Sequence, residues 1–280
     1  MQGISESWIN TFIDQALQED VGAGDYTSLA CIQPTGRSKA SLKVKDVGII
    51  AGVELAERIM KRVDPDHRFT RLIEDGTDVC VGDIAFTIEA NSQALLKAER
   101  LILNSMQRMS GIATMSERFS AEVEGLPVTI LDTRKTTPLL RPLEKWAVRI
   151  GGCSNYRDGL YDWIMIKDNH ILACGGISKA IEAVRSYASH MTKIEVECTS
   201  IDQVDEAARA GVDVILLDNM DPFMMREAVK RHEGKVLFEA SGGITLDTVR
   251  GVAQTGVNFI SVGALTHSAP ALPFHLEVDL

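Results

Sequence analysis

Polar and charged side chains follow each of six short apolar runs in the second half of this sequence. Residues 132–137 come directly after one run, 167–170 after the next, and 218–219 after a later one. A single polar run end would carry little information, because loops are generally solvated. Six in succession, with Lys, Glu and Asp directly after apolar runs, indicate a functional site where the ends of parallel strands meet.

The charges in this set predict a multiply anionic ligand. Residues 133–149 carry five cations and one anion, although the chain has 29 Lys and Arg against 39 Asp and Glu and a formal net charge of −10. A solvated helix face accounts for the later cations of that segment. Arg134, Lys135 and Lys167 adjoin apolar runs, and a charge-assisted contact from each to carboxylate or phosphate contributes about 1.5–3 kcal/mol.

Phosphate binding has its own signal after the last two runs. The residues concerned are Ser241, Gly242, Gly243, Gly263 and Ala264. Barrel enzymes often bind phosphate at this position through backbone N–H groups, and glycine permits close approach. Glu197 and Asp218 end two neighbouring runs, where they hold Mg²⁺ beside phosphates, neutralise Lys135 or Lys167, or do both. His170 suits acid–base chemistry and a structural role equally.

The sequence excludes several other classes of protein. It contains no G-x-S-x-G, no G-x-x-x-x-G-K-[ST] and no C-x-x-C, and its five cysteines are widely spaced, which favours reduced thiols. The acidic composition argues against nucleic acid as a partner. The first twenty residues lack the features of a signal peptide, and no apolar run approaches the ~18 residues of a membrane span. We therefore expect a cytoplasmic protein.

The six runs must be positioned by a repeated strand-and-helix unit. They occupy residues 128–131, 163–166, 193–197, 212–217, 235–239 and 258–262. Helical patterns separate the last five, and strands that alternate with helices predict parallel strands with right-handed crossovers. We expect these strands to form a β/α barrel that is incomplete, because it has six or seven strands instead of the usual eight. An open doubly wound sheet is the alternative, but no G-x-G-x-x-G supports it.

The first half of the chain has a different pattern and predicts a separate α+β domain. We expect a helix over residues 5–20 capped by Ser5, a turn-rich segment over 22–28, strands within 38–52 and 67–90, and helices near 53–63 and over 92–122 with a break at Gly111. The expected domains are residues 1–112 joined by the C-terminal segment 268–280, and the barrel over 113–267.

Several segments resemble quinolinate phosphoribosyltransferase, a family also called nicotinate-nucleotide pyrophosphorylase (carboxylating). The segments are LDTRKTTP (131–138), EKWAVRIGG (144–152), IKDNHI (166–171), IEVEC (194–198), LLDNM (216–220), EASGGI (239–244) and ISVGALTHS (260–268). The N-terminal ALQEDVGAGDYTS and AERLILNSMQRMSGIAT are similar to the same family, so the resemblance covers nearly the whole chain. D-T-R-K-T-T-P followed about thirty residues later by I-K-D-N-H is a specific combination.

The resemblance implies that quinolinate and phosphoribosyl pyrophosphate are converted, with Mg²⁺, to nicotinate mononucleotide, pyrophosphate and carbon dioxide in NAD biosynthesis. It implies an N-terminal open α/β sandwich, an incomplete β/α barrel, and a homodimer, or a higher oligomer, in which Arg100 reaches the neighbouring subunit's site. The substrate-binding residues that it implies are Arg100, Thr133, Arg134, Lys135, Tyr156, Arg157, Lys167, His170, Glu197, Asp218, Ser241, Gly242, Gly243, Gly263 and Ala264. Lys135, Glu197 and Asp218 are the implied catalytic residues, with Glu197 and Asp218 near the metal, directly or through water.

Two positions depart from the family pattern. The family usually has histidine where this chain has Tyr156, and tyrosine supplies no imidazolium to the diacid. Leu139 stands where the family usually has glycine, so we expect the turn there to avoid a positive φ. These departures keep two alternatives open: a related phosphoribosyltransferase for another aromatic acid, as in homologues associated with molybdate transport, and a binding protein without turnover.

Overall fold

Two antiparallel sheets organise the first part of the chain in the computed structural model, which describes residues 3–279. The larger sheet has the strand order β12-β1-β5-β3, and the smaller pairs β2 with β4. The strands are β1 (Arg37–Val44), β2 (Gly48–Ile49), β3 (Arg68–Arg71), β4 (Asp78–Val79), β5 (Ile84–Asn91) and β12 (Phe274–Asp279). Burial alternates along β1, as expected for a sheet with one face against a core.

These strands belong to one of two compact units of the chain. Unit 1 comprises Met1–Glu117, Pro142–Gly152 and Ala269–Leu280, and unit 2 comprises Arg118–Arg141 and Cys153–Ser268. The C-terminal strand β12 belongs to unit 1 because it pairs with β1, with Leu42 opposite Leu276.

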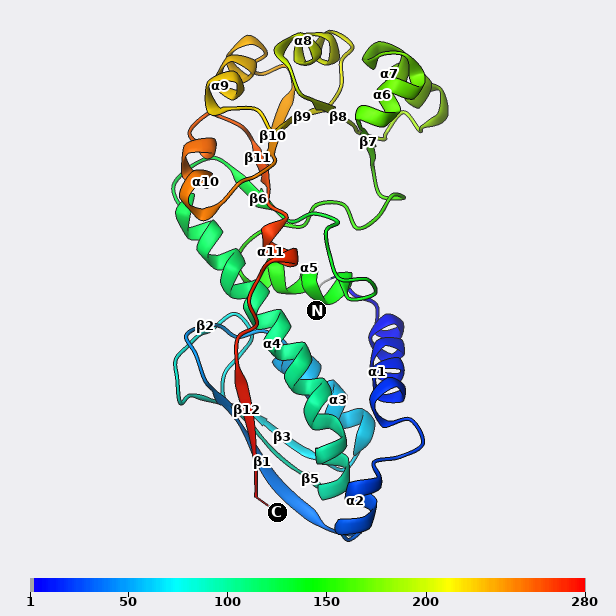
Figure 1. The fold of residues 1–280 in the computed structure, drawn as a ribbon, viewed down its shortest axis with the longest axis vertical. Coiled ribbons are helices and arrows are strands. Elements are labelled where there is room, and N and C mark those ends of the chain that lie inside the picture. The colour runs from blue at the N-terminus through cyan, green and yellow to red at the C-terminus, as the bar shows by residue number, and fades with distance from the viewer. Residues whose placement is uncertain (1–2, 280) are drawn as a thin grey trace. The chain divides into compact units, whose positions relative to one another are not determined.

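Five helices begin in the N-terminal half or in the segment that returns to unit 1. They are α1 (Glu6–Val21), α2 (Tyr26–Cys31), α3 (Val53–Val63), α4 (Ser92–Glu122) and α5 (Arg141–Ile150). In Figure 1, α3 and α4 run alongside the four-stranded sheet. Ser5 caps α1 as expected, because its hydroxyl accepts a hydrogen bond from the Trp8 N–H at 3.2 Å. The turn expected over residues 22–28 is shorter than predicted, because Asp25 caps α2.

The expected helix break at Gly111 is wrong, because α4 continues through it. A Cβ atom on Gly111 would lie 1.9 Å from the carbonyl oxygen of Pro270. The glycine is there because another part of unit 1 approaches the helix closely, and not because the helix ends. Among residues 3–279, no helix has both the length and the apolar composition that a bilayer span requires.

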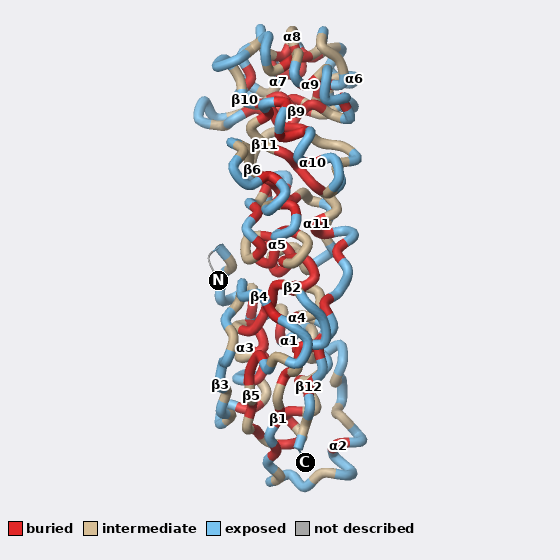
Figure 2. Tube along the Cα trace, turned by 90° about the vertical axis from the view of Figure 1, so that its left-hand side faces the viewer, coloured by how far each residue is buried: buried red, intermediate tan, exposed pale blue. Residues whose placement is uncertain are grey.

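Unit 2 is an incomplete β/α barrel of six parallel strands, as the six apolar runs predicted. The strand order is β6-β11-β10-β9-β8-β7. The strands are β6 (Thr129–Leu131), β7 (Ile164–Ile166), β8 (Ile194–Cys198), β9 (Val214–Asp218), β10 (Leu237–Ser241) and β11 (Phe259–Ser261). Ser154 adds one parallel bridge to Leu131, which extends the edge at β6 without a full seventh strand. In Figure 2 the labelled strands β9 and β10 are largely buried.

Five helices of unit 2 lie on the outer side of its curved sheet (Figure 1). They are α6 (Asp168–Cys174), α7 (Ile177–Tyr187), α8 (Ile201–Arg209), α9 (Pro222–Arg231) and α10 (Leu246–Ala253). The short helix α11 (Ala264–His267) follows directly after β11. A doubly wound sheet has helices on both faces and a reversal of strand order, so this alternative is wrong. The arrangement leaves the carboxyl ends of all six strands along one rim.

The turn after β6 contradicts one sequence expectation. Leu139 has a φ of +66°, although we expected the turn to avoid a positive value there. The Leu140 N–H donates to the Thr137 carbonyl at 3.1 Å, so Pro138 and Leu139 are the two central residues of a β-turn. Pro followed by a residue with positive φ is the pattern of a type II turn. The turn holds leucine at a positive φ, although leucine prefers a negative φ, and this costs about 1–2 kcal/mol.

Candidate active site

A cavity of about 460 Å³ lies at the carboxyl ends of the barrel strands. Its lining residues are Thr133, Arg134, Lys135, Tyr156, Arg157, Met165, Lys167, Glu197, Leu216, Asp218, Glu239, Ser241 and Ser261. Every one of the six strands contributes a residue from its end or from the segment that follows. The sequence predicted nine of these residues from the polar ends of the apolar runs and from the resemblance, and the fold brings them together.

Six other predicted residues do not line this cavity. They are Arg100, His170, Gly242, Gly243, Gly263 and Ala264. Arg100 is exposed on α4 in unit 1. His170 caps α6, where its Nδ1 accepts a hydrogen bond from the Lys167 backbone N–H at 2.9 Å, and this contact supports its structural interpretation. The glycines belong to the loops directly after β10 and β11.

Two arginines form the cationic side of the cavity, and neither has an acidic partner among the described residues. The Nε atoms of Arg134 and Arg157 are buried without a hydrogen-bond partner in residues 3–279. Burial lowers the pKa of Arg134, and the charges of Arg157 and Arg141 lower it further. Cations that repel one another in a partly buried site are costly unless an anion joins them. The cluster is therefore prepared for a bound carboxylate or phosphate.

The two lysines of the cavity are held in different ways. The Lys167 ammonium forms an ion pair with the Glu197 carboxylate. Lys135 is fixed through its backbone: its carbonyl accepts from the Thr266 hydroxyl at 2.7 Å, and its N–H donates to the Thr133 hydroxyl at 3.0 Å. A Cβ on Gly263 would lie 3.0 Å from Cδ of Lys135, so glycine at this position gives the lysine chain room. Gly263 thus acts beside the cavity without lining it.

The acidic residues of the rim do not form a preassembled metal centre. Among the described residues there is no cluster of three or more His, Cys, Asp or Glu side chains that could hold a metal ion. Glu197 is paired with Lys167, whereas no described side chain pairs with Asp218. Mg²⁺ commonly binds through one or two carboxylates together with substrate phosphates, so Asp218 and Glu197 fit that kind of site and not an all-protein cage.

Residues that the sequence prediction missed line the deeper part of the cavity. They are Met165, Leu216, Glu239 and Ser261. Each lies two residues before a predicted site position or strand end: Glu239 precedes Ser241 and Leu216 precedes Asp218 on the same face of their strands. Side chains alternate along a strand with a period of two, and this spacing was the available signal.

Glu239 is a buried acid, only 2% exposed, that lines the rim cavity. Burial raises the pKa of Glu239 well above its usual range, and the nearby Glu195 charge adds to the effect, while the Ser261 hydroxyl that donates to Glu239 acts against it. Burial likewise raises the pKa of Glu195. The raised pKa favours the neutral form of Glu239, which leaves the cations of the cavity available to a ligand.

Asp132 fixes the segment that carries Tyr156 and Arg157. Its carboxylate is fully buried and accepts hydrogen bonds from the Tyr156 backbone N–H at 2.8 Å and from the Asn155 side-chain amide at 2.6 Å. A carboxylate that accepts such bonds holds the loop in one position. The arginine of this loop therefore reaches the cavity from a rigid support.

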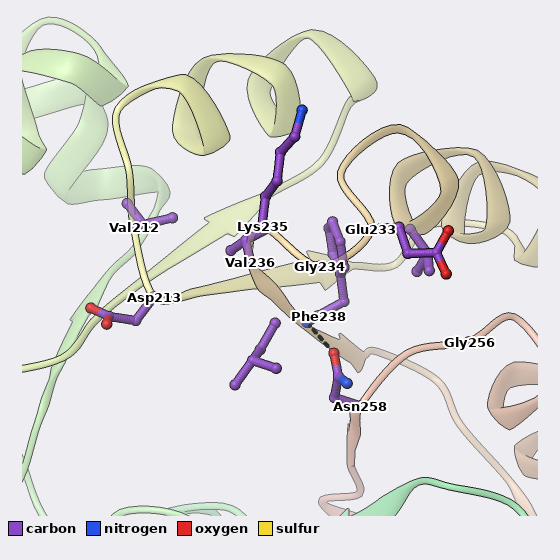
Figure 3. A pocket seen from close by; sticks show the side chains of 11 residues that line it. Val212, Asp213, Glu233, Gly234, Lys235, Val236, Phe238, Gly256 and Asn258 are labelled. Atoms are coloured by element: carbon purple, nitrogen blue, oxygen red, sulfur yellow. Dashed lines mark hydrogen bonds between the residues drawn. The ribbon is translucent and has the colours of Figure 1, made fainter.

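A second hollow, of about 560 Å³, lies at the opposite, amino ends of β9 and β10. Figure 3 shows the side chains around it, including Asp213 and Asn258. The Asn258 side-chain oxygen accepts from the Phe238 N–H at 2.9 Å, and the Asp213 carboxylate accepts from the Ile194 N–H at 2.8 Å. These polar groups complete strand hydrogen bonding, and the other charged side chains that line the larger hollow, Glu233 and Lys235, are exposed to solvent.

Comparison with known proteins gives matches along almost the whole chain. Residues 25–110 match the family model for the quinolinate phosphoribosyl transferase N-terminal domain, and residues 112–277 match the model for its C-terminal domain. The chain is 43% identical over 286 residues to quinolinate phosphoribosyltransferase [decarboxylating] 1 of Nicotiana glauca, covering 95% of this chain and 81% of the relative. It is also 43% identical over 262 residues to the probable nicotinate-nucleotide pyrophosphorylase [carboxylating] of Bacillus subtilis (strain 168), covering 94% and 90%.

Solved structures of similar proteins have the same fold as this chain. The crystal structure of NadC from Streptococcus pyogenes matches with a TM-score of 0.95 at 37% identity, covering 100% of this chain and 99% of that chain. The nicotinate-nucleotide pyrophosphorylase from Ehrlichia chaffeensis matches with a TM-score of 0.93 at 36% identity, covering 99% and 100%. From its sequence, its fold and the cationic cavity at its barrel rim, this chain belongs to the quinolinate phosphoribosyltransferase family.

Proposed function

We propose that this chain transfers the phosphoribosyl group of phosphoribosyl pyrophosphate to quinolinate in the rim cavity, with loss of one carboxyl group. The products are nicotinate mononucleotide, pyrophosphate and carbon dioxide, as the family membership indicates. The observation that carries the proposal is the pair formed by the half-buried Arg134 and the buried Arg157, whose Nε atoms are buried without a hydrogen-bond partner in the described chain. Quinolinate is a dianion that supplies two such partners.

In this proposal the diacid binds among Arg134, Arg157 and Lys167. The arginines offer planar forks of N–H donors that match carboxylate geometry, and the lysine offers a point charge. Tyr156 lies beside Arg157 and lines the same cavity. The aromatic ring of the substrate then contacts an apolar floor that includes Met165 and Leu216.

The phosphoribosyl group binds on the other side, toward β9, β10 and β11. Ser241 lines the cavity, and the Gly242 backbone passes so near Asn219 that a Cβ would lie 2.3 Å from its amide oxygen. The loop 241–243 with Gly263 offers backbone N–H groups to phosphate oxygens. Asp218 and Glu197 would hold Mg²⁺ together with those oxygens, and the bound ion would neutralise charge on the pyrophosphate.

The residues of the cavity suit each step. The ring nitrogen of quinolinate forms a bond to C1′ of the ribose while the bond from C1′ to the pyrophosphate oxygen breaks. Lys135 stabilises the departing charge, and the carboxylates of Glu197 and Asp218 favour the positive charge that develops on the ribose. The carboxyl group at C2 then leaves as carbon dioxide; its electron pair stays on C2, where the nearby cations stabilise it until a proton arrives.

The assembly and the location are part of the same proposal. We infer a homodimer in which Arg100, exposed on α4, serves the cavity of the partner subunit. An exposed arginine remote in sequence from the rim supports this assignment. A cytoplasmic location rests on the composition and the odd number of cysteines.

The test is an assay with phosphoribosyl pyrophosphate, Mg²⁺ and either quinolinate or nicotinate. We expect carbon dioxide and nicotinate mononucleotide from quinolinate, and little turnover of nicotinate, because one carboxylate leaves part of the cationic cluster unpaired. Turnover of nicotinate alone would favour the related transferase, and no turnover of either acid would exclude the proposed reaction.

A further inference from the structure

Asn219 is the first residue beyond β9, directly after Asp218, and it joins this strand to the loop that follows β10. The two strands are parallel, with Ser241 opposite Asp218. The Asn219 N–H continues this pairing, because it donates to the Ser241 carbonyl at 2.9 Å. One residue therefore connects the end of the strand that carries Asp218 to the start of the loop 241–243, which the proposed function assigns to phosphate.

Asn219 has an uncommon backbone conformation. Its φ is +53°, and it is one of two residues other than glycine that have a positive φ in the described part of the chain. Asparagine tolerates this left-handed region better than most residues do. The residue is exposed, so its side chain does not fill the core. A left-handed residue outside the core, next to a residue of the rim cavity, points to a role in the site.

The Asn219 side chain lies against Gly242, the middle residue of the loop. A Cβ atom on Gly242 would lie 2.3 Å from Oδ1 and 2.5 Å from Cγ of Asn219, so the amide leaves no room for a larger residue. Gly242 and Gly243 have φ values of +102° and +62°, which glycine adopts without strain. A Cβ atom on Gly243 would meet no atom within 4 Å. Within the glycine pair, the close contact with Asn219 is therefore specific to Gly242.

We propose that Asn219 is a positioning residue, which holds the loop 241–243 through its backbone N–H at Ser241 and its side chain at Gly242, so that the loop N–H groups stay directed toward a phosphate of the phosphoribosyl substrate. The inference rests on the proposed function, since it assigns this loop to phosphate. In that reaction Asp218 serves the ribose and the metal, whereas Asn219 fixes the loop relative to the strand of Asp218. Two successive glycines have many accessible conformations unless a neighbour limits them.

The test measures the binding of phosphoribosyl pyrophosphate with Mg²⁺, by calorimetry, in Asn219→Gly, Gly242→Ala and the double variant. Asn219→Gly keeps the left-handed backbone and removes the amide, so the loop loses one support and we expect about ten-fold weaker binding. Gly242→Ala displaces the loop or the amide, and we expect about a hundred-fold loss. Both substitutions break the same contact, so the double variant should bind within about three-fold of Gly242→Ala, whereas independent effects would multiply to about a thousand-fold.

Gly243→Ala is the matched control, because it adds the same methyl group at a positive φ without touching Asn219. Its effect should be equal, within about two-fold, with and without Asn219→Gly. Quinolinate binding should change less than about two-fold in Asn219→Gly, because a general loss of structure would weaken the binding of both substrates. Independent effects of Asn219→Gly and Gly242→Ala, or normal binding by Asn219→Gly, would overturn the inference.

Turnover separates this inference from the proposed reaction. In Asn219→Gly we expect the KM for phosphoribosyl pyrophosphate to rise about ten-fold while the KM for quinolinate stays unchanged. Unmodified protein that binds phosphoribosyl pyrophosphate and shows the coupling, but forms no product, would contradict the reaction and support the positioning role. Product formation with independent effects would contradict the positioning role alone, and unmodified protein that binds no phosphoribosyl pyrophosphate would overturn both.

Discussion

Individual residues in the rim cavity differ in how their charges are balanced. Arg134 and Arg157 have no acidic partner in the described chain, whereas Lys167 is paired with Glu197. A ligand therefore gains most from the arginines, while a contact with Lys167 competes with an existing ion pair. This difference determines how much ligand binding free energy we expect each substitution to remove.

Lys167→Ala should weaken quinolinate binding by about 1.5–3 kcal/mol, because one charge-assisted contact is lost. Because a ligand contact competes with the existing ion pair to Glu197, we expect the effect at the lower end of that range. Calorimetric titration of each substrate measures it, and Lys230→Ala, an exposed lysine on α9, is the control. An equal loss for quinolinate and for phosphoribosyl pyrophosphate would contradict the placement of Lys167 on the diacid side.

Glu239→Gln should change how stability depends on pH. The raised pKa of Glu239 means that the folded protein keeps a proton that the unfolded chain releases near pH 4.3, so stability falls as pH rises between that value and the folded pKa. The unmodified protein should lose up to about 1.4 kcal/mol per pH unit relative to Glu239→Gln in this window. Urea unfolding from pH 5 to 8 measures the difference, with the exposed Glu233→Gln as control. Parallel pH curves would refute it.

At the scale of elements, the functional residues lie at the ends of the barrel strands, and the turns that follow the strands orient them. The residues that act lie at the ends of β6 to β11, and the loop after β6 carries Thr133, Arg134 and Lys135 into the cavity. That loop ends in the turn with Leu139, which is 85% exposed and held at a positive φ. Strain near a functional loop is tolerated when the surrounding structure determines the conformation.

Leu139→Gly should leave the fold unchanged and raise stability by up to about 1 kcal/mol, because glycine relieves the strain but has more freedom in the unfolded chain. Leucine at this position is so exposed that little packing is lost. Leu160→Gly, at an exposed loop leucine with negative φ in the same unit, should be neutral or destabilising. Denaturant unfolding of both variants checks the prediction, and equal effects would show that the turn is not strained.

At the scale of the whole molecule, the proposed homodimer predicts complementation between damaged subunits. If Arg100 serves the partner's cavity, then Arg100→Ala and Lys167→Ala homodimers each have two damaged sites. A mixed dimer has one site with both lesions and one with neither. Random exchange makes half of the dimers mixed, so activity should recover to about a quarter of the unmodified level.

Mass spectrometry of the mixture establishes independently that subunits have exchanged. Arg118→Ala, at another exposed arginine on α4, should be active by itself and is the matched control. Exchange without recovered activity would mean that Arg100 does not act in the partner's site.

The sequence by itself determined the features that depend on neighbours along the chain. The six apolar runs became β6 to β11, Ser5 capped α1, and the polar residues after each run came together at one rim. Local patterns suffice for these features because hydrogen bonding and the alternation of side chains repeat with a fixed period. The specific motifs after the strands were sufficient to indicate the family.

Only the tertiary structure decided the features that depend on residues far apart. The Tyr156 hydroxyl meets Glu195 across 39 positions, and α4 has a glycine at position 111 because Pro270 approaches the helix there. The Ser261 hydroxyl reaches Glu239, 22 positions away, through the pairing of β10 with β11. Such contacts follow from packing and strand register, which no local pattern encodes, since a shift of one residue would turn every side chain to the other face.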